Sequence, residues 1–75
     1  MTTLRIRLSL AENAKTVAKI FREHAYDVDL RDGRHVVNAK STPGVLSLKL
    51  SRPLTVEVHA DDCDDLLHEL QPYRV

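Results

Sequence analysis

Apolar and polar residues alternate along three stretches of the chain, and a period of two is typical of a strand that buries one face. These stretches run from Leu4 to Leu10, from Tyr26 to Arg31 and from Leu54 to Ala60. Asp32-Gly33 is predicted to be a two-residue hairpin turn, and the return strand then runs from Arg34 to Lys40. The pattern therefore predicts four strands, of which the second and third form a hairpin.

Apolar residues recur at helical spacing in two other stretches. One helix is predicted from Leu10 to about His24, and Ser9 with Glu12 three residues later fits a capping box at its start. The other helix carries an apolar stripe from Cys63 to Leu70, behind a run of acidic residues that favour a helix start. Pro72 ends this second helix.

The segment "GVLSLKL", residues 44–50, fits both periods, because some of its apolar residues stand at helical spacing while others alternate. The residues before it favour a helix. Ser41 is a good N-cap residue, and Pro43 falls in the first turn, where a missing amide hydrogen matters least. We therefore predict one or two helical turns over residues 42–48.

The predicted order of elements is strand, helix, strand, strand, short helix, strand, helix (β-α-β-β-α-β-α). We expect an α+β fold in which helices cover one face of a four-stranded sheet. A chain of 75 residues is long enough for one domain and too short for two, so residues 1–75 are interpreted as a single domain. So small a domain has little room for a deep active-site cleft, which disfavours elaborate catalysis.

Composition and charge argue against several kinds of partner. The chain has 11 basic and 11 acidic residues and 4% aromatic residues, so we expect no nucleic-acid partner. Its N-terminal stretch contains no apolar run that suits a secretion signal or a membrane span, and we expect a cytoplasmic protein without a membrane partner. Cys63, the single cysteine, is expected to be a buried packing residue.

The stretch "VVNAKSTPGVLSLKLSRPLTVEVHADD" resembles the second half of HPr, the family of phosphocarrier proteins of the bacterial phosphotransferase system. Its most specific part is "NAKS" followed by "GVLSL". The resemblance implies an open-faced β-sandwich with an antiparallel sheet of strand order 1-4-2-3, which agrees with the predicted order of elements. The serine of this block is a regulatory phosphorylation site in the family, and the corresponding residue here is Ser41.

The first half of the chain departs from the family. HPr proteins carry a phosphorylatable histidine at the N-terminus of the first helix, in a His-x-Arg-Pro pattern, whereas the corresponding stretch here is "SLAENAKTV". Asn13 and Lys15 do not replace this histidine, because an amide is not nucleophilic and an exposed lysine is protonated at neutral pH. His24 is expected in the last turn of the predicted helix, near its C-terminal carbonyls. The chain therefore resembles a short branch of HPr-like proteins that lacks the histidine, and no catalytic residue or cofactor is assigned.

The leading hypothesis is a non-catalytic HPr-like regulatory or protein-interaction module of the phosphotransferase system. Two interpretations of Ser41 remain open, since it is either an N-cap alone or an N-cap that is also phosphorylated. HPr kinase and HPr-binding regulators are the expected partners. Their docking surface would combine the start of the first helix with some of the residues after Ser41: Thr42, Pro43, Val45, Leu46 and Ser47.

Two alternative functions remain open. One is a phosphocarrier that uses an atypical histidine, such as His24 or His35. The other is a small-molecule-binding regulatory domain, because α+β sandwiches of this size often pair edge to edge and bind ligands between subunits. The sequence does not determine the oligomeric state, although the first and third strands are expected at the sheet edges.

A metal site is disfavoured by the expected strand order. It would need His35, Glu57 and His59 to converge, whereas Glu57 is expected to face Arg5 or Arg7 across the sheet. The acidic run at residues 61–65 lacks the glycine and the terminal glutamate of a calcium loop, and it is interpreted as a helix start. No metal ligand is assigned.

Overall fold

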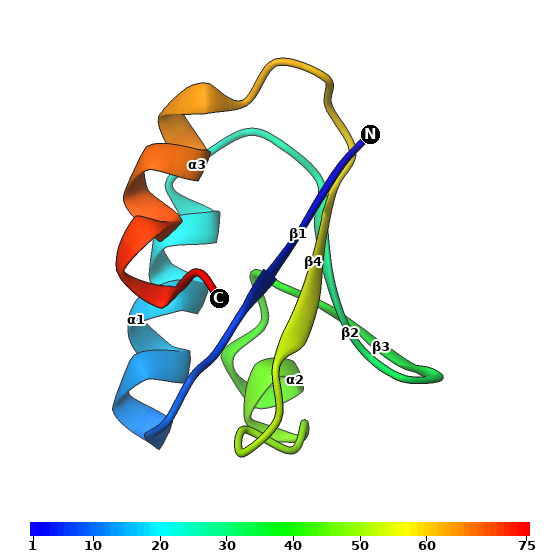
Figure 1. The fold of residues 1–75 in the computed structure, drawn as a ribbon, viewed down its shortest axis with the longest axis vertical. Helices are drawn as coiled ribbons and strands as arrows, with labels where there is room; N and C mark the ends of the chain where they lie inside the picture. Colours follow the sequence, from blue (N-terminus) through cyan, green and yellow to red (C-terminus); the bar gives the residue numbers. More distant parts are fainter.

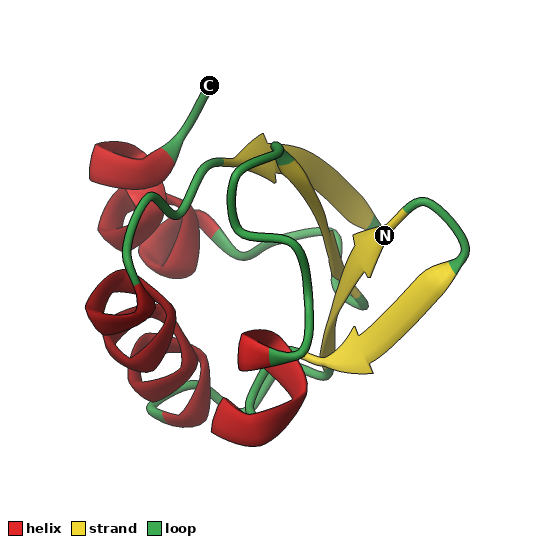
Figure 2. Ribbon diagram, turned by 90° about the horizontal axis from the view of Figure 1, so that it is seen from below, coloured by secondary structure: helices red, strands yellow, loops and turns green.

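The computed structural model describes all 75 residues and has an antiparallel sheet with its helices packed on one side (Figure 1). Viewed from below, the helices lie together on one side and the opposite face of the sheet is open (Figure 2). The elements in chain order are β1 (Thr2–Ile6), α1 (Ala11–Arg22), β2 (Val28–Asp32), β3 (His35–Asn38), α2 (Thr42–Leu46), β4 (Leu54–Val58), α3 (Asp64–Leu70) and the 3-10 helix η1 (Gln71–Tyr73).

The strand order is β1-β4-β2-β3, and every neighbouring pair is antiparallel. This confirms the predicted α+β fold, its order of elements and the position of β1 and β3 at the edges. The edge of β1 is partly covered by the C-terminal segment, because the Arg7 amide donates to Tyr73 O at 2.8 Å and the Val75 amide donates to Arg5 O at 3.2 Å. The sequence pattern did not predict this last pairing.

The core consists of 18 buried residues, all apolar. Alternating residues of the strands point into it, because a strand directs successive side chains to opposite faces. Helix α1 contributes Ala14, Val17, Ala18 and Phe21, which lie on one face of the helix. Cys63 is 1% exposed, which confirms its predicted packing role.

The hairpin turn differs from the prediction. Asp32 and His35 pair directly, so the two loop residues are Gly33 and Arg34 rather than Asp32 and Gly33. Gly33 has a φ of +61°, which suits the first position of the type II′ turn that joins twisted strands. The glycine therefore sets the position of the turn one residue later than its Asp-Gly pattern indicated.

Several element ends also differ from the alternation pattern. β1 stops at Ile6, and Leu10 is 61% exposed although the alternation extended to it. Tyr26 lies outside β2, which begins at Val28. The ambiguous segment is helical as predicted, but α2 ends at Leu46. None of the helices has the length and apolar character needed to cross a membrane.

Candidate functional site

Ser41 caps the start of helix α2. Its backbone is extended, and its Oγ accepts a hydrogen bond from the Gly44 amide at 3.2 Å. Thr42 and Pro43 occupy the first two helical positions, so the second position provides no amide hydrogen. The predicted capping role of Ser41 is confirmed.

Gly44 permits the close approach of the capping side chain. A Cβ at position 44 would lie 3.2 Å from Ser41 Oγ and 3.3 Å from Ser41 Cβ. These separations are shorter than the optimal contact between carbon atoms. A larger residue would therefore press on the Ser41 side chain, so glycine suits this position.

Arg22 reaches the start of α2 from the last turn of α1. Its Nη1 donates to Lys40 O at 2.9 Å and to Thr42 Oγ1 at 3.0 Å, on either side of Ser41. Lys40 itself turns toward the end of α1, where its Nζ donates to His24 O at 2.8 Å. No sequence pattern indicates a role for Arg22, because only the packing of α1 against α2 brings it near Ser41.

The side chains around α2 divide into an exposed and a buried group. Val45 is fully buried, so the prediction that it contributes to a docking surface is wrong. It points inward because α2 packs against α1 and β3. Leu46 remains 38% exposed. We call the accessible residues the α2 surface, and they are Thr42, Pro43, Leu46 and Ser47.

Helix α1 starts without a side-chain cap. The predicted capping box is wrong, because the N-cap residue is Leu10 and no side chain accepts a hydrogen bond there. The chain is still extended at Leu10, so the helix begins one residue later than a cap at Ser9 requires.

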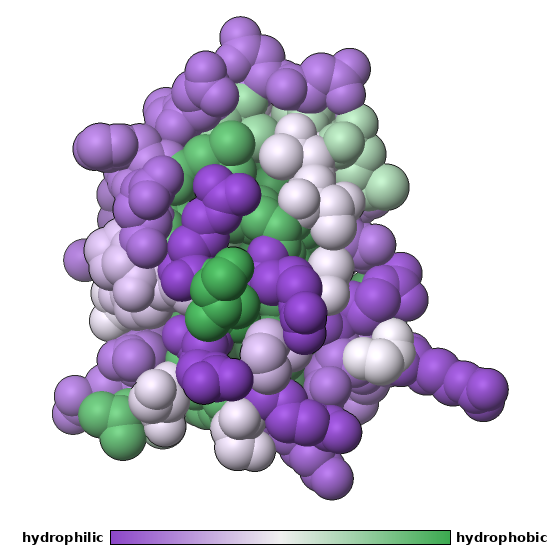
Figure 3. All heavy atoms as spheres, in the orientation of Figure 1, coloured by the Kyte–Doolittle hydropathy of each residue, from purple (hydrophilic) through white to green (hydrophobic).

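An isolated hydrophobic spot appears at the lower left of Figure 3, where α1 begins. No residue from Leu10 to Arg22 is a histidine.

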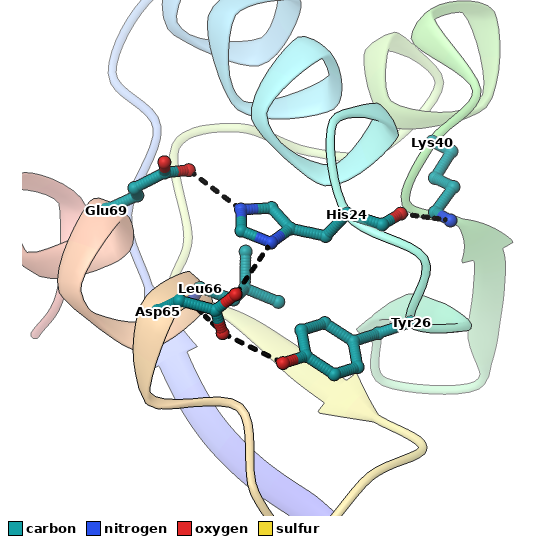
Figure 4. Close-up of polar contacts among 6 residues, drawn as sticks. All are labelled: His24, Tyr26, Lys40, Asp65, Leu66 and Glu69. Atoms are coloured by element: carbon teal, nitrogen blue, oxygen red, sulfur yellow. Dashed lines mark hydrogen bonds and ion pairs between the residues drawn. The ribbon is translucent and has the colours of Figure 1, made fainter.

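His24 lies beyond α1, which ends at Arg22, so its predicted place in the last helical turn is wrong. Its side chain is only 12% exposed and lies between two carboxylates of α3 (Figure 4). Nε2 is 2.9 Å from Glu69 Oε2, and Nδ1 is 3.4 Å from Asp65 Oδ2. The ring also stacks on Tyr26 at a centroid separation of 5.9 Å. His24 therefore joins the end of α1 to α3.

This geometry is unfavourable for a phosphoryl acceptor. An imidazole attacks phosphorus through a nitrogen lone pair, and the attacking nitrogen must be accessible to the donor. At His24 each ring nitrogen faces a carboxylate, which would repel an anionic phosphoryl group. The contacts of His24 support a structural role.

We expect Tyr26→Phe to flatten the dependence of stability on pH at both ends. The Tyr26 hydroxyl donates to Asp65 Oδ1 at 2.8 Å, which raises the pKa of Tyr26 to about 12 and lowers the pKa of Asp65 below its ordinary 3.8. Folding thus favours the charged carboxylate, and this stability is complete above pH 3.8 and lost as pH falls through the lowered pKa. Folding also favours the neutral phenol, and that stability is lost as pH rises from 10.0 to about 12.

Urea unfolding at roughly pH 2 to 5 and pH 9 to 12 measures both effects. The stability of the wild type should fall more steeply than that of Tyr26→Phe in each range. Tyr73→Phe is the matched control, because the Tyr73 side chain is half-buried and has no carboxylate partner. Parallel curves for the wild type and Tyr26→Phe would show that the hydrogen bond to Asp65 contributes nothing.

The three residues considered for a metal site, His35, Glu57 and His59, do not converge, and Glu57 and His59 form ion pairs instead. His59 Nε2 is 3.0 Å from Asp29 Oδ2. Glu57 Oε1 is 3.1 Å from Arg31 Nη2, so its partner comes from β2 and the expected partners Arg5 and Arg7 are wrong. His35 lies on the far edge strand. No group of three histidine, cysteine or acidic side chains is placed to hold a metal ion.

An open pocket adjoins this face and does not include Ser41 or the α2 surface. Five of its six lining residues are polar or charged, and Val28 is the apolar one. Binding sites for small organic molecules are mostly apolar with a few polar groups. The pocket therefore does not favour the alternative of a small-molecule-binding domain. Its lining residues are Asp27, Val28, Asp29, Asn38, Lys40 and His59.

The comparisons with known proteins identify the fold. No protein-family model and no curated protein sequence matches the chain. The structure is similar to the phosphocarrier protein HPr of Bacillus anthracis, with a TM-score of 0.78 and 22% identity over 99% of this chain and 96% of that chain. It is also similar to HPr-C-His of Thermoanaerobacter tengcongensis, with a TM-score of 0.79 and 20% identity over 96% of this chain and 89% of that chain.

A histidine-containing phosphocarrier protein of mycoplasma matches as well, with a TM-score of 0.73 and 17% identity over 95% of this chain and 86% of that chain. These similarities show that the protein has the fold of the HPr phosphocarriers. The open-faced sandwich that the resemblance implied is thus confirmed.

Proposed function

We propose that this protein is a non-catalytic HPr-like regulatory or protein-interaction module of the bacterial phosphotransferase system. It acts as a single cytoplasmic domain, is phosphorylated at Ser41 by an HPr kinase, and passes no phosphate through a histidine. The observation that carries this proposal is an HPr fold in which Ser41 starts α2 while Leu10, rather than a histidine, starts α1.

The surroundings of Ser41 support the phosphorylation step. A phosphate there would add about 1.5 to 2 negative charges. The guanidinium of Arg22, which already bonds to Thr42 Oγ1 at 3.0 Å, is close enough to form a charge-assisted hydrogen bond with it. Because Pro43 lacks an amide hydrogen, Arg22 and the Gly44 amide, which already donates to Ser41 Oγ, would supply most of the stabilisation.

The start of α1 supports the absence of histidine transfer. A nucleophile at a helix N-terminus must form a covalent bond to phosphorus, and a leucine side chain has no atom that can do so. The exposed Leu10 instead extends the apolar part of a protein-binding surface. We infer that a partner docks on the α2 surface together with Leu10.

The mass of the intact protein after incubation with ATP and an HPr serine kinase tests this proposal. The wild type is expected to gain one phosphate. Ser41→Asn is expected to gain none, because an asparagine keeps an oxygen that can cap α2 but has no hydroxyl group to phosphorylate.

Ser51→Ala is the matched control, because Ser51 is exposed and lies beyond α2 and outside the α2 surface, and it should gain phosphate like the wild type. Circular dichroism should show that all three proteins are folded. An unmodified wild type, in a reaction where the kinase modifies a true HPr, would refute phosphorylation at Ser41. A phosphate on Ser41→Asn would place the modification on another residue.

A further inference from the structure

The open face of the sheet carries its charges in two rows that run across the strands. The register aligns outward residues of all four strands, and no helix covers them (Figure 2). One row contains two acidic residues and no basic ones, and the next contains two arginines and no acidic residues. The acidic row is Thr3, Glu57, Asp29 and Asn38, and the basic row is Arg5, Thr55, Arg31 and Val36.

The separation of charge continues beyond the strand ends. Asp27 precedes β2 at the acidic end and forms no ion pair. Arg7 and Arg34 lie at the basic end, and neither they nor Arg5 form an ion pair. Arg34 belongs to the loop of the β2–β3 hairpin, whose tip projects at the lower right of Figure 1 and is hydrophilic in Figure 3. Lys40 and His59 line the same pocket as Asp27 and Asp29 at the acidic end, but the carboxylates of Asp27, Asp29 and Glu57 outnumber them there. The face thus has one positive end and one end that is negative on balance.

We propose that two copies of this chain associate through their open faces, related by a twofold axis that runs across the strands. Such an axis reverses the strand direction, so the basic row of each copy lies over the acidic row of the other. A twofold axis along the strands would instead place like charges together. In an isologous contact the same surface of both copies meets, so that surface must be complementary to itself. With the axis across the strands, the positive end of each copy meets the negative end of the other, and this condition is met.

The arrangement places specific charges opposite each other. Because the axis crosses the strands, each strand lies over its own copy, and Asp29 faces Arg31 of the second copy. Arg5 lies over Thr3 of the second copy. Glu57 of the second copy lies beside that Thr3 on the neighbouring strand, so the long side chain of Arg5 can reach its carboxylate. Arg5 forms no ion pair within its own chain, and this contact would provide one.

The contact should be weak and sensitive to salt. Four strands at a spacing of about 4.8 Å and five residues at about 3.4 Å cover roughly 300 Å² on each copy, below the ~800 Å² per partner of a stable complex. Exposed charge pairs are also screened within a Debye length of about 8 Å at physiological ionic strength. This interface lies on the side of the sheet opposite α2, so it does not depend on the proposed function.

Sedimentation equilibrium of the full chain at up to about 1 mM protein tests the proposal. The association constant should fall at least tenfold when ionic strength rises from about 0.02 to about 0.5 M. Asp29→Arg alone and Arg31→Asp alone should each weaken association at least tenfold, because each puts like charges over one another. An equimolar mixture of the two variants should associate at least as tightly as the wild type, because every such pair is then opposite in charge.

Lys19→Glu on the exposed side of α1 is the control for a change in net charge, and it should associate like the wild type. Circular dichroism checks that each variant is folded. A wild type that stays monomeric at low salt overturns the proposal and leaves the face for a different partner. Variants that associate as the wild type does, or a mixture in which association is not restored, overturn it as well.

Discussion

Replacing Phe21 by alanine is expected to remove a large part of the stability of this protein. Phe21 is fully buried and is the largest fully buried side chain of the core. Truncating a buried phenylalanine to alanine typically costs about 3 to 5 kcal/mol. At 0.05 to 0.15 kcal/mol per residue, a chain of this length has a free energy of unfolding of only about 4 to 11 kcal/mol.

Thermal unfolding followed by circular dichroism measures this loss. The Tm of Phe21→Ala should fall by at least about 12 °C, since each kcal/mol corresponds to about 4 to 8 °C for a small domain. Leu10→Ala is the control, because Leu10 is 61% exposed, and its free energy of unfolding should change by no more than about 0.5 kcal/mol. A Phe21→Ala variant as stable as Leu10→Ala would contradict the observed packing of α1 on the sheet.

Replacing Leu46 by glutamate is expected to lower the kcat/KM of Ser41 phosphorylation by about 30-fold. This figure corresponds to the roughly 2 kcal/mol that defines a central residue of a protein interface. Leu46 is the exposed large apolar residue of the α2 surface. A carboxylate there would have to lose its hydration when a partner docks, which is costly without a compensating charge.

Val36→Glu is the matched control for this experiment. Val36 is 41% exposed, close to the 38% of Leu46, but it lies on the open face of the sheet. The kinase should therefore phosphorylate Val36→Glu as fast as the wild type. Equal rates for Leu46→Glu and the wild type would show that the kinase does not dock on the α2 surface.

The fold could be predicted from the sequence because its signals are local. The strand residues alternate, α1 carries its apolar residues at helical spacing, and Ser41 caps α2 through contacts with residues that follow it directly. The sequence shows that Glu57 and Arg31 have opposite charges. Whether they form a pair depends on which strands are neighbours in the sheet and on the register between them.

The features that the sequence did not predict depend on tertiary packing. Arg22 reaches Ser41 only because α1 packs against α2, and Val45 is buried because α2 packs on both α1 and β3. His24 was expected near the C-terminal carbonyls of the first helix. It faces Asp65 and Glu69 instead, because α1 ends before it and α3 lies beside the end of α1. The partners of these side chains lie on other elements of the chain, so no local sequence pattern predicts the contacts.

The mass of the intact wild-type protein after incubation with phosphoenolpyruvate and enzyme I determines whether any histidine of this protein accepts phosphate. The absence of a histidine at the start of α1, together with the two carboxylates that face His24, predicts an unchanged mass while a true HPr in the same reaction gains one phosphate. A phosphate that appears on this protein and is lost on mild acid treatment would be held by a histidine. That result would refute a non-catalytic role and identify the protein as a phosphocarrier.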